Sequence, residues 1–206
     1  MNCDPIARAY RWLEYAAFGR ALERRRFAFL PDFTNIRRAL VLGDGDGRFL
    51  ARLAAAAPLA RIDYIDLSAR MLELARRRAG VDRISYQRSN ALDLKLPEAE
   101  YDLVATHFFL DCFEPEDCSK LVDRIGAASR PDARWVVSEF RKPTNGWPSV
   151  AAGALIPILY FFFRVTSGLK TRRLTDHRII FERYGFRLAR IQPAWRGLLA
   201  SELWMR

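Results

Sequence analysis

Apolar residues occur along this chain both in short unbroken runs and at helical spacing, and the two patterns alternate. The short runs predict seven strands, at residues 39–42, 61–66, 84–88, 101–106, 135–139, 185–191 and 198–204. The helical pattern predicts helices at residues 4–30, 49–57, 68–78, 115–129 and 176–184, with a turn at 130–132. We therefore expect an α/β fold in a single domain over residues 1–206: a doubly wound, mostly parallel seven-stranded sheet with helices on both faces and the last strand antiparallel.

The first strand runs directly into a turn with three glycines, Gly43, Gly45 and Gly47. Glycine accepts positive φ and allows a ligand close to the backbone, and the next helix begins with unpaired N–H groups. A dinucleotide fingerprint needs its third glycine at Arg48, and a phosphate-binding loop would end in Lys-Ser or Lys-Thr, so neither motif is present. A calcium loop would need oxygen ligands at Arg48 and Ala55.

Two carboxylates, those of Asp44 and Asp46, lie between these glycines. They would repel a phosphate, so we expect a ligand that is cationic or neutral at this turn. The second strand ends at Asp66, 23 positions beyond Gly43. A carboxylate at about this distance accepts hydrogen bonds from the ribose hydroxyls of an adenosine cofactor. Asp63, in the middle of the same strand, is expected to be an exposed side chain instead.

Residues 41–47 resemble motif I of the class I S-adenosylmethionine-dependent methyltransferases, and Asp66-Leu67-Ser68 followed by Met71-Leu72 resembles their second motif. The resemblance covers nearly the whole chain and is specific up to about Glu139. It implies a Rossmann-like methyltransferase fold, with S-adenosylmethionine as the cofactor and its cationic sulfonium wrapped by the glycine turn. The cofactor-binding residues that it implies are Gly43, Asp44, Gly45, Gly47, Asp66, Leu67, Met71, Asn90, Ala91 and Thr106.

Two of the implied contacts have a structural alternative. Asn90 stands where the family usually has an aspartate that binds the adenine amino group, and it keeps an acceptor oxygen, but an asparagine is also common in a turn. The family often has an N-terminal helix over the cofactor, here residues 1–30, with a tyrosine near it. Tyr10 is the candidate, and it either contacts the cofactor or packs this helix on the core.

Methyl transfer to an activated cofactor needs a general base only if the acceptor loses a proton. His107, Asp111 and Glu139 follow strands four and five, where open α/β sheets bind their ligands, and are the candidates. His107 has a suitable pKa, although a histidine there can equally bond to the backbone or line a pocket. Asp111 can instead stabilise the turn into the next helix.

An insertion at residues 143–184 separates strands five and six, where the resembling enzymes build their acceptor pocket. Residues 150–163 lack any charge, a run shorter than the roughly 20 residues of a spanning helix. A core helix is one interpretation, and a lid over a small apolar or aromatic acceptor, in contact with a membrane surface, is the other. The chain lacks the motifs of enzymes that methylate exocyclic base amines or cytosine C5, and its tail is similar to quinone-biosynthesis C-methyltransferases.

The net charge of +10 comes almost wholly from arginine. Solvated helix faces explain it, and so would a nucleic acid or an anionic membrane. An RNA-binding or RNA-modifying methyltransferase is therefore the alternative function, with triplets at 24–26 and 76–78 and a pair at 172–173 as its footprint. We expect no specific nucleic-acid site, because aromatic residues are not interleaved with these arginines. A non-catalytic partner protein is a third hypothesis, which the intact glycine turn and Asp66 oppose.

Cysteine and histidine are scarce: the chain has 3 Cys and 2 His, without a metal-binding or redox spacing. We expect no metal site, reduced thiols and a cytoplasmic protein, because the polar N-terminus does not resemble a signal peptide. The sequence leaves the oligomeric state open.

Overall fold

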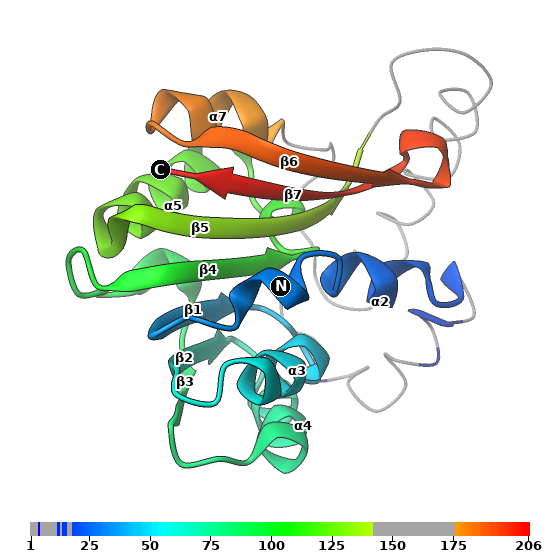
Figure 1. Cartoon of the computed structure of the whole chain (residues 1–206), viewed down its shortest axis with the longest axis vertical. Helices are drawn as coiled ribbons and strands as arrows, with labels where there is room; N and C mark the ends of the chain where they lie inside the picture. Colours follow the sequence, from blue (N-terminus) through cyan, green and yellow to red (C-terminus); the bar gives the residue numbers. More distant parts are fainter. Residues whose placement is uncertain (1–3, 5–11, 13, 16–17, 142–175) are drawn as a thin grey trace.

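The computed structural model describes residues 4, 12, 14–15, 18–141 and 176–206. They form a seven-stranded sheet in the order β3-β2-β1-β4-β5-β7-β6 (Figure 1). Neighbours from β3 to β5 are parallel, and β7 is antiparallel to both β5 and β6. The strands are β1 (Arg38–Leu42), β2 (Arg61–Asp66), β3 (Ile84–Arg88), β4 (Tyr101–His107), β5 (Ser129–Phe140), β6 (Arg187–Ala194) and β7 (Leu199–Met205). The predicted fold class is confirmed.

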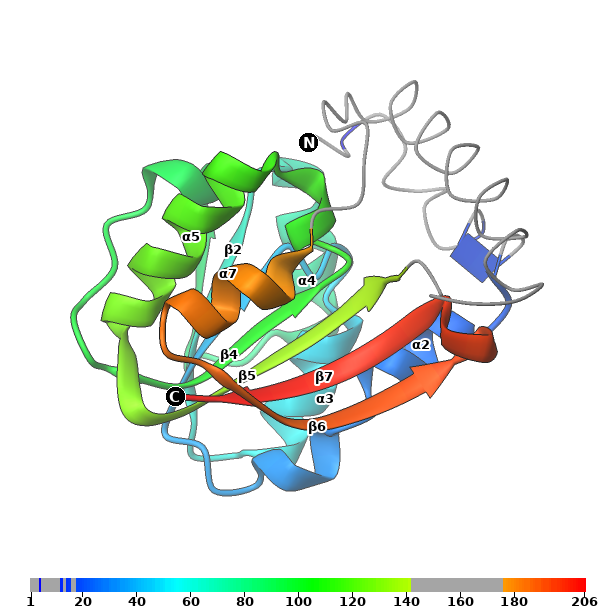
Figure 2. The same ribbon diagram turned by 90° about the horizontal axis from the view of Figure 1, so that it is seen from above.

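Helices cover both faces of this sheet, as Figure 2 shows from above. α3 (Arg48–Ala56) and α4 (Ala69–Ala79) bury their apolar stripes in one core, and α5 (Pro115–Ala128) and α7 (His177–Arg183) form the other. α2 (Ala21–Arg26) packs beside β7. The 3₁₀ turns are η2 (Leu30–Phe33), η3 (Ala91–Asp93), η4 (Leu110–Cys112) and η5 (Trp195–Gly197).

The register of the central strand β1 determines which residues lie at the carboxyl edge of the sheet. Residues 39–42 are fully buried, which is the expected result for an unbroken apolar run in a parallel sheet covered on both faces. Leu42 pairs with Ile65 on one side and with Thr106 on the other. The register therefore brings Gly43, Asp66 and His107 to the same carboxyl edge. The chain order reverses between β1 and β4, and open α/β sheets bind ligands at such a point.

Two predicted boundaries were wrong. The turn expected at residues 130–132 is extended, because β5 already begins at Ser129. The register of its pairing with β4 shifts between Tyr101 and Leu103. This irregular stretch accommodates Pro131, which has no backbone N–H for a hydrogen bond between strands. The helix expected to continue to residue 30 ends at Arg26, and a separate 3₁₀ turn with a proline in its first positions follows.

Several predicted features lie outside the described residues. They include Tyr10 and much of the first part of the N-terminal cover (residues 1–3, 5–11, 13 and 16–17), the uncharged run at 150–163, most of the insertion at 143–184, and the arginines at 172–173. Among the helices that are described, none is both long and apolar enough to cross a membrane.

Candidate functional site

A cavity opens at the carboxyl edge, between the turns that follow β1, β2, β3 and β4. Its described lining is Gly43, Gly45, Ile65, Asp66, Leu67, Met71, Ser89, Asn90, Ala91, Phe108, Phe109, Cys112 and Phe113. Four parallel strands thus each contribute one segment. The lining combines the glycine turn and Asp66 with three phenylalanines from the turn after β4.

The three glycines have positive φ values of 62°, 67° and 75°, which other residues adopt only with strain, but they serve different purposes. A Cβ on Gly43 would stand 2.3 Å from Cδ2 of Phe109, and one on Gly47 would stand 2.7 Å from the Cα of Ala75. These two positions therefore allow close packing against the turn after β4 and against α4. A Cβ on Gly45 would meet only the Met71 side chain, at 3.9 Å, so the missing side chain at Gly45 leaves space in the cavity.

Asp66 stands in the cavity wall at the end of β2. Its Oδ1 accepts a hydrogen bond of 2.8 Å from the backbone N–H of Ser68. Burial raises the pKa of Asp66 to about 6, although backbone N–H groups of Ser68 and Gly45 act in the opposite direction. Ser68 in turn accepts from the N–H of Met71 at 3.1 Å and so begins α4. Asp63 faces away from this cavity and bonds to Arg38 and Tyr101.

Asn90 builds a turn and also lines the cavity, and its bond to the adenine amino group stays a prediction. Its Oδ1 accepts from the N–H of Leu92 at 3.2 Å, and its Nδ2 donates to Asp93 at 3.0 Å. An amide oxygen has two lone pairs, which leaves one acceptor position for a ligand.

The carboxylates of Asp44 and Asp46 are not in the described lining of the cavity, because both side chains bond within the protein. Asp46 accepts from Arg48 at 3.0 Å and pairs with Arg78 at 2.6 Å. Asp44 is buried and accepts from the N–H of Leu50 at 3.0 Å, near the start of α3. Burial raises its pKa to about 7 against the opposing effect of Arg26.

The remaining predicted residues surround the cavity without being in its described lining. Thr106 is fully buried and accepts from the indole N–H of Trp135 at 2.9 Å. His107 is buried against Phe49, with Nδ1 3.0 Å from the hydroxyl of Ser138. Its Nε2 has no hydrogen-bond partner among the described residues. Burial, together with Arg26, holds the pKa of His107 well below its usual range, so the ring is neutral.

Glu139 is buried, and its Oε1 accepts from the backbone N–H groups of Phe109 at 2.9 Å and Leu110 at 2.8 Å. Burial and the neighbouring Asp111 raise the pKa of Glu139 well above its usual value. Asp111, which is half-buried, lies in η4 and contacts Cys112. This geometry makes Glu139 a support for the turn after β4.

Sequence reasoning did not select the aromatic part of the lining, Phe108, Phe109 and Phe113. Phe108 has a φ of 55°, an uncommon conformation for a bulky residue. The available signal was the run of aromatic residues directly after a predicted strand, at the edge where ligands bind. Among the described residues, no group of three or more His, Cys, Asp or Glu side chains is suited to hold a metal ion.

Residues 39–132 match a family model described as a methyltransferase domain. The chain is 32% identical over 112 residues to the demethylmenaquinone methyltransferase of Deinococcus radiodurans, which covers 53% of this chain and 46% of that protein. It is 36% identical over 108 residues to the enzyme of the same name from Clavibacter sepedonicus, covering 52% and 42%. The chain thus matches less than half the length of each relative.

Solved structures share the fold over almost the whole chain. An S-adenosylmethionine-dependent methyltransferase from Mesorhizobium loti has a TM-score of 0.67 at 23% identity, covering 94% of this chain and 100% of that one. The 1,6-didemethyltoxoflavin-N1-methyltransferase of Burkholderia thailandensis has a TM-score of 0.68 at 18% identity, covering 98% and 84%. At these identities the similarity shows the fold alone.

Proposed function

We propose that this chain, a class I S-adenosylmethionine-dependent methyltransferase by its fold and by the family model that it matches, methylates a small apolar or aromatic acceptor. The observation that carries the proposal is the cavity, whose lining combines the glycine turn and Asp66 with three phenylalanines. A cavity with both polar and aromatic lining suits a nucleoside cofactor beside a lipophilic molecule.

The described residues fit the cofactor. Asp66 offers a carboxylate, already oriented by the N–H of Ser68, to the two ribose hydroxyls. Gly45 provides the space for the amino-acid part to approach the backbone. Leu67, Met71 and Ala91 provide apolar contacts to the base, and Asn90 an acceptor for its amino group. When bound, the cofactor supplies an electrophilic methyl group, and the protein mainly positions the acceptor.

Phe108, Phe109 and Phe113 are the residues that we assign to the acceptor end. Their rings exclude water and offer π faces to a planar acceptor. If this acceptor loses a proton, neutral His107 is the candidate base, because its Nε2 lacks a partner among the described residues. Its ring would have to be reached from the cavity, whose described lining does not include it.

The relatives favour a quinone-like acceptor, since the two that we describe are named demethylmenaquinone methyltransferases. Calorimetry with S-adenosylhomocysteine tests the cofactor site. Two methylation assays with labelled S-adenosylmethionine test the acceptor. The first offers the protein a short-chain demethylmenaquinone, and the second offers it a metabolite extract. Binding without methylation of any lipophilic fraction would contradict the acceptor class and leave the cofactor site intact.

The lid predicted at residues 143–184 remains part of this proposal, including its contact with a membrane surface. Leu159→Asp and Phe162→Asp are the test variants. Both should bind S-adenosylhomocysteine normally and lose methylation of a lipophilic acceptor. Variants that unfold would favour a plain core helix, and fully active variants would exclude the lid.

The RNA hypothesis gains no support from the described arginines. Arg26 is buried, and Arg78 pairs with Asp46. Arg76 lies over the ring of Tyr86, and Arg77 pairs with Glu73. These four arginines therefore each have a contact within the protein or are buried.

A further inference from the structure

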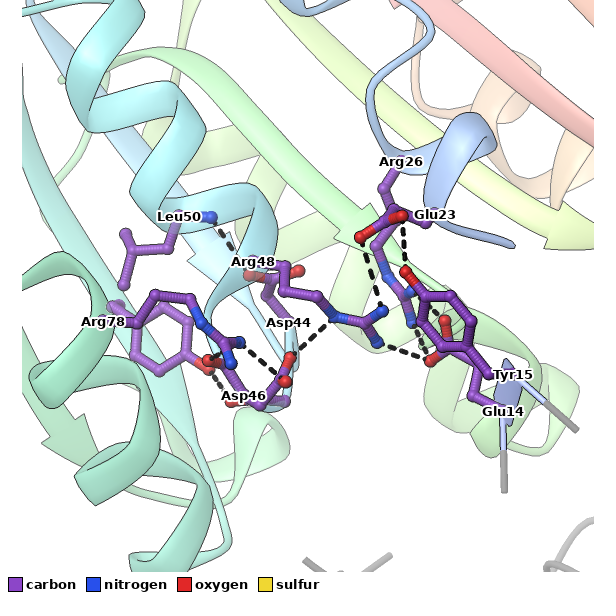
Figure 3. A network of polar contacts seen from close by, with 11 residues as sticks. Glu14, Tyr15, Glu23, Arg26, Asp44, Asp46, Arg48, Leu50 and Arg78 are labelled. Atoms are coloured by element: carbon purple, nitrogen blue, oxygen red, sulfur yellow. Dashed lines mark hydrogen bonds and ion pairs between the residues drawn. The ribbon is translucent and has the colours of Figure 1, made fainter. Parts of the chain in front are cut away.

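A network of charged side chains connects Glu14, near the N-terminus, to the glycine turn, as Figure 3 shows. Glu14 accepts from Arg26 at 2.6 Å and from Arg48 at 2.7 Å. Arg48 also donates to Asp46 at 3.0 Å, and Asp46 pairs with Arg78 at 2.6 Å. The order Arg26, Glu14, Arg48, Asp46, Arg78 alternates in sign along its whole length.

The charged groups at the centre of this network are buried from solvent. The side chains of Glu14, Asp46 and Arg48 are only 3%, 7% and 7% exposed. Burial raises the pKa of Glu14, but Arg26 and Arg48 outweigh it and leave the pKa below its usual value. Buried charges of this kind persist only when they are paired, so removing one partner leaves another uncompensated.

The same network also contacts the backbone of the glycine turn. Asp46 lies between Gly45 and Gly47, and Arg48 is the first residue of α3. Arg78 donates to the carbonyl of Asp46 at 2.7 Å. Tyr64 donates to the carbonyl of Gly45 at 2.6 Å. Side chains from α4 and β2 thus fix two successive carbonyls of a turn whose glycines are in the left-handed region.

A second attachment joins the N-terminal segment to the other side of the cavity. Asp4 accepts from the N–H of Arg70 at 3.1 Å and from the hydroxyl of Ser68. Ser68 follows Asp66 by two residues and begins α4. Asp4 and Glu14 therefore bond to the two segments that line the cofactor end of the cavity, although neither is in its described lining.

We propose that Glu14 and Arg48 are positioning residues for the cofactor: through Asp46 they hold the glycine turn in its binding conformation. This inference rests on the proposed function. It makes cofactor affinity depend on Glu14, which lies near the N-terminus and is linked to the turn through Arg48.

The test compares Glu14→Gln, Arg48→Met and the double variant by calorimetry with S-adenosylhomocysteine. Each single variant should raise the Kd at least tenfold. The double variant should bind no more weakly than the weaker single variant, because both changes cut the same link. In turnover assays the KM for S-adenosylmethionine should rise while kcat at saturating cofactor stays within a few-fold of the wild type.

Asp63→Asn is the matched control, because it removes a carboxylate from an arginine pair outside the described cavity lining. It should lower the melting temperature without changing the Kd. An unchanged Kd in Glu14→Gln, or independent additive losses in the double variant, would overturn the positioning role alone. A wild-type protein that fails to bind S-adenosylhomocysteine would overturn the proposed function and this inference with it.

Discussion

Phe109 packs directly on Gly43, so that any Cβ at position 43 would overlap its ring, 2.3 Å from Cδ2. The contact joins the turn after β1 to the turn after β4, across the point where the chain order of the sheet reverses. Glu139 accepts a hydrogen bond from the backbone N–H of the same phenylalanine. The glycine turn and the aromatic wall therefore form one packed unit, and changes in either should affect the cavity.

Substitutions at Gly45 and Gly47 should affect cofactor binding and folding stability to different degrees. Gly45→Ala places a methyl group in the cavity without a close contact, so it should weaken S-adenosylhomocysteine at least tenfold and cost only the roughly 1–2 kcal/mol of left-handed strain. Gly47→Ala adds a clash with the backbone of Ala75 to the same strain, so it should destabilise more. Urea unfolding and calorimetry on both variants provide the measurement. Equal effects on Kd and stability in the two variants would contradict this assignment.

Asp66 should make cofactor affinity depend on pH. Its carboxylate must be ionised to accept both ribose hydroxyls, and its pKa is about 6. Affinity for S-adenosylhomocysteine should therefore fall as the pH is lowered through about 6. Asp66→Ala removes a charge-assisted acceptor worth roughly 1.5–3 kcal/mol, so the Kd should rise about tenfold to a hundredfold.

Asp63→Ala, on the same strand, is the control for this measurement and should leave the Kd and its pH dependence unchanged. Unaltered binding by Asp66→Ala would remove Asp66 from the site.

The fold, and the presence of the glycine turn and Asp66 at the carboxyl edge, could be predicted because both depend on local sequence. An unbroken apolar run followed by glycines specifies a buried strand and a turn, and Asp66 marks the end of the next strand. Ser68 likewise caps α4, as its position predicted. Such features need no knowledge of distant residues.

Long-range pairing could not be predicted in the same way. In the sequence, Arg48 only excludes a dinucleotide fingerprint and a calcium loop, whereas in the structure it bonds to Glu14, 34 positions away. The carboxylate of Asp46 pairs with Arg48 and with Arg78 on α4, and the second of these partners cannot be identified from spacing alone. The turn at 130–132 was wrong because a bulge accommodates Pro131 inside a strand.

Asp44 should limit stability at high pH. Its pKa is 3.8 when unperturbed and about 7 in the folded protein, so the folded state binds the extra proton and stability falls as the pH rises between these values. The full penalty, present above pH 7, is about 4 kcal/mol. Asp44→Asn keeps an acceptor for Leu50 and should stabilise the protein by roughly 1–3 kcal/mol at pH 8, after the cost of an unpaired amide.

The measurement is urea unfolding of wild type and Asp44→Asn from pH 4 to pH 8.5. The stabilisation by Asp44→Asn should fall toward low pH and become a destabilisation there, because the penalty of the wild-type carboxylate disappears as the pH approaches 3.8 while the cost of the amide remains. Asp66 and Glu139 have raised pKa values too and contribute trends of the same sign, but they are present in both proteins. A constant difference across the range would mean that Asp44 is not the titrating group.

Glu139 distinguishes a positioning role from a catalytic one. Burial and Asp111 raise its pKa well above the usual value, and one oxygen accepts the N–H groups of Phe109 and Leu110. Glu139→Gln preserves this acceptor, so stability should change by less than about 1 kcal/mol and turnover by only a few-fold. Glu139→Ala leaves two buried N–H groups unpaired, which should cost roughly 2–4 kcal/mol and release the strained Phe108. If Glu139→Gln instead abolishes methylation while binding S-adenosylhomocysteine normally, an ionised Glu139 takes part in the chemistry, and our assignment of it as a support is wrong.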